Sequence, residues 1–157
     1  MTQHHFQQSI EINATPEQVE RCFTDHGMMH RWLNPALRCD PVGESWQVTV
    51  GAKSRFVLNI PVLEPCLMNE VVVREPQTIV WRFSGFFVGT DRWQWHSLGD
   101  DRTYLDNTFT CTIPNPFVSF GFRTIAAAWT RRDMRQQLQR LKQVAEGLTM
   151  ANGATSP

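Results

Sequence analysis

Asp91 occupies the position in this sequence that best suits acid–base chemistry. In "TDRWQWHS" it stands two residues before Trp93 and four before Trp95, and alternate residues of a strand share one face. A carboxyl group among tryptophans would be poorly hydrated, and such a group has the displaced pKa that a general acid or base needs. A single buried Asp is also a common structural partner of an Arg or of backbone amides, so the position alone permits catalysis without establishing it.

Other kinds of chemistry have weaker support. His26 and His30 have the i, i+4 spacing of metal ligands, but no third ligand follows at an informative spacing. The chain has no nucleophile motif with an ordered triad and no glycine-rich phosphate-binding loop. We therefore predict no metal site, no nucleophilic catalysis and no cofactor.

The charge balance excludes some partners. Lys plus Arg is 15 and Asp plus Glu is 15, which leaves a formal net charge of zero, so no overall field attracts nucleic acid or an anionic membrane. The pattern of basic residues on the C-terminal helix fits a solvated helix face better than a nucleic-acid footprint; these residues are Arg131, Arg132, Arg135, Arg140 and Lys142. We predict no nucleic-acid partner.

Hydropathy and cysteine usage bound the location. No stretch approaches the roughly 20 apolar residues of a transmembrane segment, and the first residues are polar and alternating, unlike a signal peptide. The four cysteines are scattered and form no CxxC pair, which fits reduced thiols. We predict no transmembrane segment and a cytoplasmic location.

The N-terminal pattern predicts a strand and two short helices. Apolar residues alternate from Phe6 to Ile12, which is the period of a strand. Thr15 can then cap a helix whose first turn holds Pro16. "HGMMHRWLNP" predicts a second short helix that stops before Pro35.

The central pattern, from residue 37 to 113, predicts only strands and turns. Its connections are short, which favours antiparallel hairpins. Residues 37–50 fit either one bent strand or two. The segments rich in β-branched and aromatic residues are Leu37–Val42, Trp46–Val50, Arg55–Ile60, Leu67–Arg74, Thr78–Ser84, Gly89–Leu98 and Arg102–Ile113.

The C-terminal pattern predicts one long helix between Pro116 and about Gly147. Its apolar stripe is Met134, Leu138, Leu141, Ala145 and Leu148. Continued backwards at 3.6 residues per turn, this stripe reaches Ala127, Thr124 and Phe120. Small side chains there, including Ala126 to Ala128, would leave room between the helix and the sheet. We expect residues 1–148 to form a single domain and 149–157 a flexible tail.

The first segment, "FQQSIEINATPEQVERCFTDHGMMHRWLNP", with Ala14-Thr15-Pro16-Glu17-Gln18-Val19 at a helix start and Trp32 closing the second helix, resembles the SRPBCC superfamily. This group includes START and Bet v 1-like proteins and proteins of the polyketide cyclase/dehydrase and lipid-transport type. "REPQTIVWRF" and "DRWQW" are similar to strand pairs of the same group, and the resemblance covers residues 6 to about 147. It implies an α+β helix-grip fold, in which a curved antiparallel sheet of six to seven strands wraps around the long helix and leaves a cavity. The superfamily includes lipid carriers, metabolite binders, cyclases and co-chaperones, so the fold does not decide the function.

Hairpin geometry predicts which side chains face that helix. If the loop after Ser84 is centred on Phe87, the facing pairs are Trp81 with Trp93, Phe83 with Asp91, and Ile79 with Trp95. A three-residue connection at Gly99-Asp100-Asp101 places Leu105 opposite Trp95 and Asn107 opposite Trp93. The predicted inner face is Ile79, Trp81, Phe83, Asp91, Trp93, Trp95, Leu105, Asn107, Phe109 and Cys111, and the outer face is Arg82, Arg92, Gln94, His96, Tyr104, Asp106 and Thr108.

Two interpretations of the inner face follow. The tryptophans fill a dry core, as aromatic side chains do in many sheets, or they line a binding cavity. Asp91 and Asn107 favour a cavity, because unpaired burial of a polar group costs about 1 to 3 kcal/mol. Arg131 either pairs with Asp91 or lies at the rim with its stem along apolar surface.

The leading hypothesis is therefore a domain that binds or carries a hydrophobic small molecule, such as a lipid, an isoprenoid or an aromatic polyketide-like compound. One alternative is a cofactor-independent cyclase or dehydratase that uses Asp91 as acid or base. The other is a protein-interaction module or homodimer that uses Trp129 and Phe122, which point away from the stripe. The residues expected to contact the ligand are Trp32, Phe56, Leu58, Trp81, Phe83, Asp91, Trp93, Trp95, Asn107, Phe109, Phe120, Ala127 and Arg131.

Overall fold

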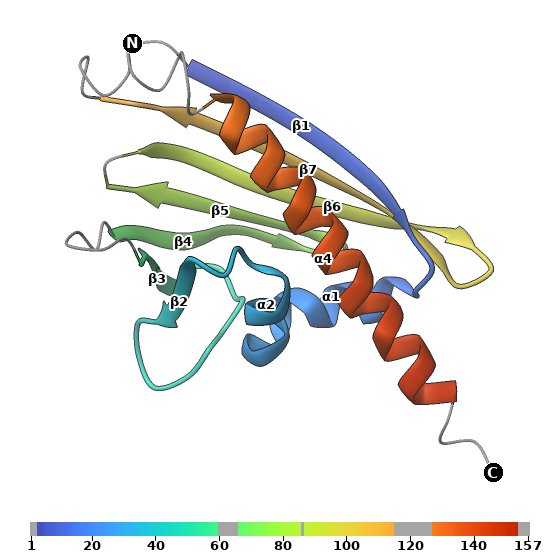
Figure 1. The fold of residues 1–157 in the computed structure, drawn as a ribbon. Helices are drawn as coiled ribbons and strands as arrows, with labels where there is room; N and C mark the ends of the chain where they lie inside the picture. The colour runs from blue at the N-terminus through green and yellow to red at the C-terminus, as the bar shows by residue number, and fades with distance from the viewer. Residues whose placement is uncertain (1–2, 60–65, 86, 115–126, 154–157) are drawn as a thin grey trace.

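The structure is a computed structural model, and it describes residues 3–59, 66–85, 87–114 and 127–153, with the side chains of 127–129 left out. Figure 1 shows the arrangement, in which one long helix crosses a face of an antiparallel sheet. In chain order the elements are β1 (Gln3–Ile12), α1 (Pro16–Thr24), α2 (His26–Trp32), β2 (Leu37–Pro41), β3 (Lys53–Leu58), β4 (Cys66–Glu75), β5 (Thr78–Ser84), β6 (Val88–Gly99), β7 (Arg102–Thr112) and α4 (Ala127–Gly153).

The two short helices begin at side-chain caps that the sequence supplies. Thr15 accepts a hydrogen bond from the backbone N–H of Gln18, and the Gln18 side chain accepts one from the Thr15 N–H, which completes a capping box. Asp25 caps α2 by accepting from the N–H of Met28. The predicted cap at Thr15 and the tandem short helices are confirmed.

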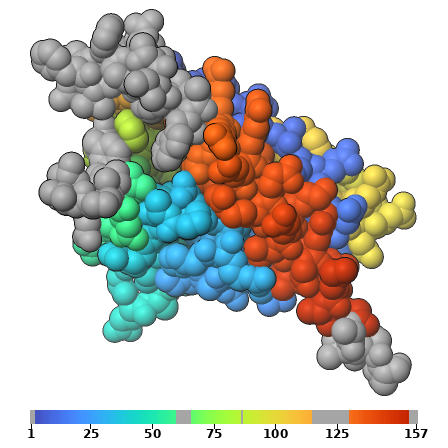
Figure 2. Space-filling view, in the orientation of Figure 1, coloured from blue at the N-terminus to red at the C-terminus, as the bar shows by residue number. Residues whose placement is uncertain are grey.

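The strands form one sheet in the order β1-β7-β6-β5-β4-β3-β2 within the described part of the chain, and each neighbouring pair is antiparallel. Strands β2 to β7 form a meander, and its last strand, β7, pairs with β1 at the edge of the sheet (Figure 1). In Figure 2 α4 lies beside α1 and α2 and the helices cover this face together. The α+β helix-grip fold, with two short helices after the first strand, is confirmed.

The hairpin between β6 and β7 has the predicted partners. Trp93 pairs with Asn107 and Trp95 with Leu105. The turn itself is tighter than expected, because Asp100 and Asp101 both have positive φ, at 52° and 55°, as the central residues of a type I′ turn do. A register shift between Ser97 and Gly99 restores the alignment of the inner faces.

The hairpin between β5 and β6 has a different register from the predicted one. Trp81 pairs with Asp91 and Ile79 with Trp93, so the hairpin is centred one residue before Phe87. Because the shift amounts to two residues of pairing, which is one full strand period, every side chain keeps its predicted face and only its partner changes.

The segment Trp46–Val50 is not a strand, which corrects the prediction and shows that residues 37–50 hold a single strand, β2. Strand β3 already pairs with β2 on one side and β4 on the other. The segment instead forms a loop, in which Val48 is buried and the indole Nε1 of Trp46 donates to the Phe23 carbonyl at 3.0 Å. Trp46 and Val48 therefore reflect contact with the core rather than strand pairing, whereas Val50 is exposed.

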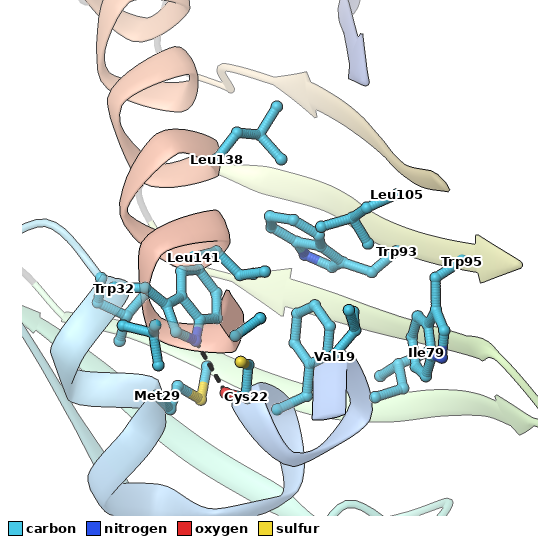
Figure 3. Close-up of a cluster of buried hydrophobic side chains, with 14 of the residues drawn as sticks. Val19, Cys22, Met29, Trp32, Ile79, Trp93, Trp95, Leu105, Leu138 and Leu141 are labelled. Carbon is cyan, nitrogen blue, oxygen red and sulfur yellow. Dashed lines mark hydrogen bonds between the residues drawn. The ribbon is translucent and has the colours of Figure 1, made fainter. Parts of the chain in front are cut away.

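The core lies where α1, α2 and α4 meet the sheet. Phe23 is fully buried, with ring centroids 5.2 to 6.1 Å from those of Trp32, Trp81, Trp93 and Trp95. Figure 3 shows Leu138 and Leu141 approaching Trp93 from the helix side, and Val19 doing so from α1.

The long helix presents the predicted stripe to this core. Met134, Leu138, Leu141 and Ala145 are buried and Leu148 is partly buried. The helix continues to Gly153, past the predicted end near Gly147, so residues 149–153 of the expected tail are helical.

Candidate functional site

A cavity of about 230 Å³ lies between the sheet, α2 and α4. Its wall is mostly apolar and aromatic, with a few amide, hydroxyl and carboxyl groups. This is the composition expected of a small-molecule site. The lining residues are Met29, Trp32, Leu33, Asn34, Leu37, Phe56, Leu58, Leu67, Asn69, Trp81, Phe83, Phe87, Asp91, Trp93, Asn107, Phe109, Cys111, Thr130, Asp133, Met134 and Gln137.

Asp91 lies in the sheet wall of the cavity and is held by two donors. The indole Nε1 of Trp93 donates to its Oδ2 at 2.9 Å, and the Nδ2 of Asn107 donates to its Oδ1 at 2.6 Å. Asn107 is buried and also donates to the Arg92 carbonyl at 3.1 Å. These bonds explain how two polar residues are tolerated on the apolar face.

Burial raises the pKa of Asp91 from 3.8 to about 6, while the hydrogen bonds from Trp93 and Asn107 act in the opposite direction. Desolvation disfavours the charged form, and donors to the carboxylate favour it. Near neutral pH this carboxyl can therefore either hold or release a proton. That property suits a general acid or base as well as a hydrogen-bonding ligand.

A second carboxyl, Asp133 of α4, lines the same cavity. Its Oδ1 accepts from Asn34 at 2.7 Å and its Oδ2 accepts from Gln137 at 3.2 Å. Burial raises the pKa of Asp133, against the hydrogen bond from Asn34, the charge of Arg140 and the hydrogen bond from Gln137. Asp133 was not predicted as a site residue, because it is one position outside the apolar stripe.

Other cavity residues were also not predicted, although the periodicity of the sequence could have identified some of them. Leu67 and Asn69 follow from the two-residue period of β4, which could have placed them beside Val71 on the inner face. Thr130 is one turn before Met134 and continues the stripe. Asn34 and Leu37 lie in and after the connection that follows α2 and carried no comparable signal.

Most of the predicted ligand contacts lie together in this cavity. They come from α2, β3, β5, β6 and β7, and each of these elements contributes at least one side chain to the wall. The predicted residues that line it are Trp32, Phe56, Leu58, Trp81, Phe83, Asp91, Trp93, Asn107 and Phe109.

Trp95 and Arg131 are not among the lining residues of this cavity. Trp95 is buried against Phe23, with stacked rings 5.3 Å apart, and belongs to the core. Arg131 is exposed, and its guanidinium lies 5.7 Å from the centroid of the Phe6 ring of β1. Phe120 and the side chain of Ala127 lie outside the described residues.

The position of Arg131 follows from helix geometry. At about 100° per residue, Arg131 lies about 60° to one side of Met134, while Thr130 and Asp133 lie on the other side. The first side faces β1, where Gln8 donates to the Arg131 carbonyl at 3.0 Å. The second faces α2 and the cavity, so the expected pairing of Asp91 with Arg131 is not made.

The aromatic face therefore serves both roles that the sequence allowed. Trp95 and Phe23 are core packing, whereas Trp81 and Trp93 are buried in the core and also form part of the cavity wall. Cys111 lines the cavity too, and burial raises the pKa of its thiol to about 11. At neutral pH this thiol stays protonated and is a poor nucleophile.

The histidine pair has structural partners. His26 Nε2 donates to the Cys39 carbonyl at 2.7 Å, and His30 Nε2 accepts from the Cys39 N–H at 3.1 Å. Among the residues that the structure describes, no group of three or more His, Cys, Asp or Glu side chains could hold a metal ion. All four cysteines are free thiols. No helix in the described ranges has the length and hydrophobicity needed to cross a bilayer.

Comparison with known proteins places this fold and cavity in context. The family described as polyketide cyclase/dehydrase and lipid transport has a sequence model that matches residues 3–146. No curated protein matches the chain in sequence.

Several solved structures are similar in fold. TTHA0849 from Thermus thermophilus is 16% identical with a TM-score of 0.73, and the match covers 98% of this chain and 100% of that one. The Zhui aromatase/cyclase from Streptomyces sp. R1128 is 14% identical with a TM-score of 0.73, over 92% and 94% of the two chains. Ara h 8.0201 is 11% identical with a TM-score of 0.67, over 96% and 99%. At these identities the likeness shows a shared fold.

Proposed function

Because the chain belongs to the polyketide cyclase/dehydrase and lipid transport family, we propose that it binds a hydrophobic small molecule in the cavity between the sheet and α4. The observation that carries this proposal is the cavity wall, in which aromatic and aliphatic side chains from the sheet and helices surround a few polar groups. When an apolar ligand displaces water from a wall of this kind, the free energy of the system falls, which favours binding.

The volume limits the size of the ligand. A dry cavity of about 150 Å³ is known to hold benzene, so about 230 Å³ corresponds to a compound of roughly ten non-hydrogen atoms on the same scale. Compounds with one or two aromatic rings, or short isoprenoids, fit this size. A long acyl chain would need the cavity to open further.

Native mass spectrometry tests the proposal. The protein is incubated with a lipid and small-molecule extract, and we expect an added mass together with a higher melting temperature, because a ligand that binds only the folded state stabilises it. Leu67→Trp, which fills part of the cavity, should reduce the added mass. Met68→Trp is the matched control, since Met68 is the next residue of β4 and is exposed. Absence of any added mass, with no thermal shift, would contradict the proposal.

A second candidate is a cofactor-independent cyclase or dehydratase with Asp91 as acid or base. The specific observation in its favour is a carboxyl with a pKa of about 6 in an apolar cavity, which matches the requirement for proton transfer near neutral pH. With a substrate in hand, Asp91→Asn should lower turnover by about a hundredfold or more while leaving the fold intact. Unchanged turnover in that variant would remove the assignment.

Self-association and location are further proposals. Phe122 and the side chain of Trp129, which we expected at a partner or homodimer surface, lie outside the described residues. Sedimentation of the full chain tests the homodimer, and a monomer at all concentrations would contradict it. A cytoplasmic location is supported by the four free cysteines.

A further inference from the structure

The polar groups of the cavity wall include three strong hydrogen-bond acceptors. Two are the carboxylates of Asp91 on β6 and Asp133 on α4, and the third belongs to the side-chain amide of Asn69 on β4, a residue that also lines the cavity. The three acceptors come from different elements around one cavity. A ligand in this cavity therefore meets acceptors on more than one side.

Asn69 makes the acceptor character specific. Its Oδ1 is fully buried and has no hydrogen-bond donor among the described residues. A buried acceptor without a partner costs about 1 to 3 kcal/mol, unless a ligand or a water molecule supplies the donor. By contrast, each oxygen of Asp91 and Asp133 already accepts one hydrogen bond and has room for a second.

The charges of the wall have one sign. Among the described lining residues Asp91 and Asp133 are the only ionisable side chains besides Cys111, and no Lys, Arg or His belongs to that set. Arg140 is near enough to Asp133 to lower its pKa. However, Arg140 Nε donates to the Trp32 carbonyl at 2.9 Å, and Arg140 does not line the cavity. A carboxylate or phosphate inside would thus face two carboxyl groups and none of the cationic side chains that could pair with it among these lining residues.

We infer that the cavity selects apolar ligands that present hydroxyl or amino hydrogen-bond donors, and that it rejects ligands carrying a carboxylate or another anionic group. This inference rests on the proposed function, since it names the class of ligand that the same cavity takes. It separates hydroxylated aromatic or short isoprenoid compounds from carboxylic acids of similar apolar bulk. The specificity arises because a ligand without a hydrogen-bond donor leaves buried acceptors of the cavity unpaired, which weakens its binding.

Four naphthalene derivatives of suitable size form the test. 2-Naphthol and 2-methylnaphthalene have equal numbers of non-hydrogen atoms and differ in the hydroxyl donor. 2-Naphthoate and 2-acetonaphthone are likewise matched and differ in the negative charge. Dissociation constants are measured by isothermal titration calorimetry at pH 7.5, above the pKa of Asp91. The indole Nε1–H resonance of Trp93, which donates to Asp91, reports binding at this site by NMR.

We expect 2-naphthol to bind about tenfold or more tightly than 2-methylnaphthalene, and 2-naphthoate to bind at least about tenfold more weakly than 2-acetonaphthone. Equal affinities within both pairs would overturn the inference and leave the proposed function standing, because apolar binding would still be present. Failure of all four compounds to bind would overturn the inference together with the proposed function.

Variants identify the groups responsible. Asn69→Leu should reduce the preference for 2-naphthol over 2-methylnaphthalene, and Asp133→Asn should relax the discrimination against 2-naphthoate. Asp106→Asn is the matched control, since Asp106 lies on β7 outside the cavity, where Gln7 donates to it. If Asp133→Asn fails to fold, the Asn69→Leu comparison and the wild-type ligand pairs still decide the outcome. Preferences unchanged in Asn69→Leu and Asp133→Asn would overturn the inference.

Discussion

Replacing Asp91 with Asn should change the stability of the protein by an amount that depends on pH. Burial raises the pKa of Asp91 from 3.8 to about 6 in the folded state, so the folded protein binds this proton more tightly than the unfolded chain does. The contribution of Asp91 to stability is then fully present below about pH 4 and is lost as the pH rises to about 6 and beyond. Asn cannot ionise, so Asp91→Asn lacks this pH-dependent loss.

The magnitude follows from the pKa. A pKa moved from 3.8 to about 6 corresponds to about 3 kcal/mol of stability lost at high pH. Because part of this is already lost by pH 4.5, about 2 kcal/mol falls between pH 4.5 and 7.5. For a domain of this size that is about 6 °C in relative melting temperature. The altered hydrogen bonds to Trp93 and Asn107 add an offset that is the same at each pH.

Urea unfolding of both proteins at intervals between pH 4.5 and 7.5 measures the effect. The stability of Asp91→Asn minus that of the wild type should grow by about 2 kcal/mol across this range, with its midpoint below pH 6. A difference that is flat with pH, or that shrinks as the pH rises, would refute the conclusion that Asp91 is a desolvated carboxyl. ¹³C NMR titration of the Asp91 carboxyl in the wild type provides an independent value of the pKa.

Three further variants test other parts of the structure. Asn107→Leu removes a donor to the carboxylate and should raise the pKa of Asp91 above 6 in a ¹³C NMR titration; an unchanged pKa would show that this bond is not formed. Gly89→Ala places a Cβ against the backbone of β7 at Thr110, so the variant should be severely destabilised in thermal unfolding, and a wild-type melting temperature would contradict the close approach. Phe23→Ala should cost about 3 to 5 kcal/mol in urea unfolding, because it leaves a cavity among four tryptophans, and a loss under about 1 kcal/mol would mean that the site is loosely packed.

Local features of the fold could be predicted from the sequence because they depend on neighbours in the chain. The two-residue period of β6 placed Asp91, Trp93 and Trp95 on one face, and the Thr15 cap marked the start of α1. The stripe from Met134 to Leu148 identified the buried face of α4. Nine of the thirteen predicted ligand contacts line the cavity, among them Asp91 and Trp93, which share a face of β6.

The contacts between elements, by contrast, depend on tertiary packing. The register of β5 against β6 depends on how the hairpin closes, and a two-residue shift preserves every face, so the sequence pattern cannot detect it. Likewise the segment Trp46–Val50 has the pattern of a strand but forms a loop against the core, where Val48 is buried and Trp46 donates to the Phe23 carbonyl.

The cavity itself shows the same division. The residue pattern is enough to show which face of the sheet is apolar and that Asp91 belongs to it, because strand periodicity is a local property. It could not determine which edge of the α4 stripe faces the cavity. Arg131 and Asp133 flank that stripe on opposite sides, and only the packing of α4 against β1 and α2 places Arg131 on Phe6 and Asp133 in the cavity wall. The second carboxylate of the site is therefore a product of tertiary packing.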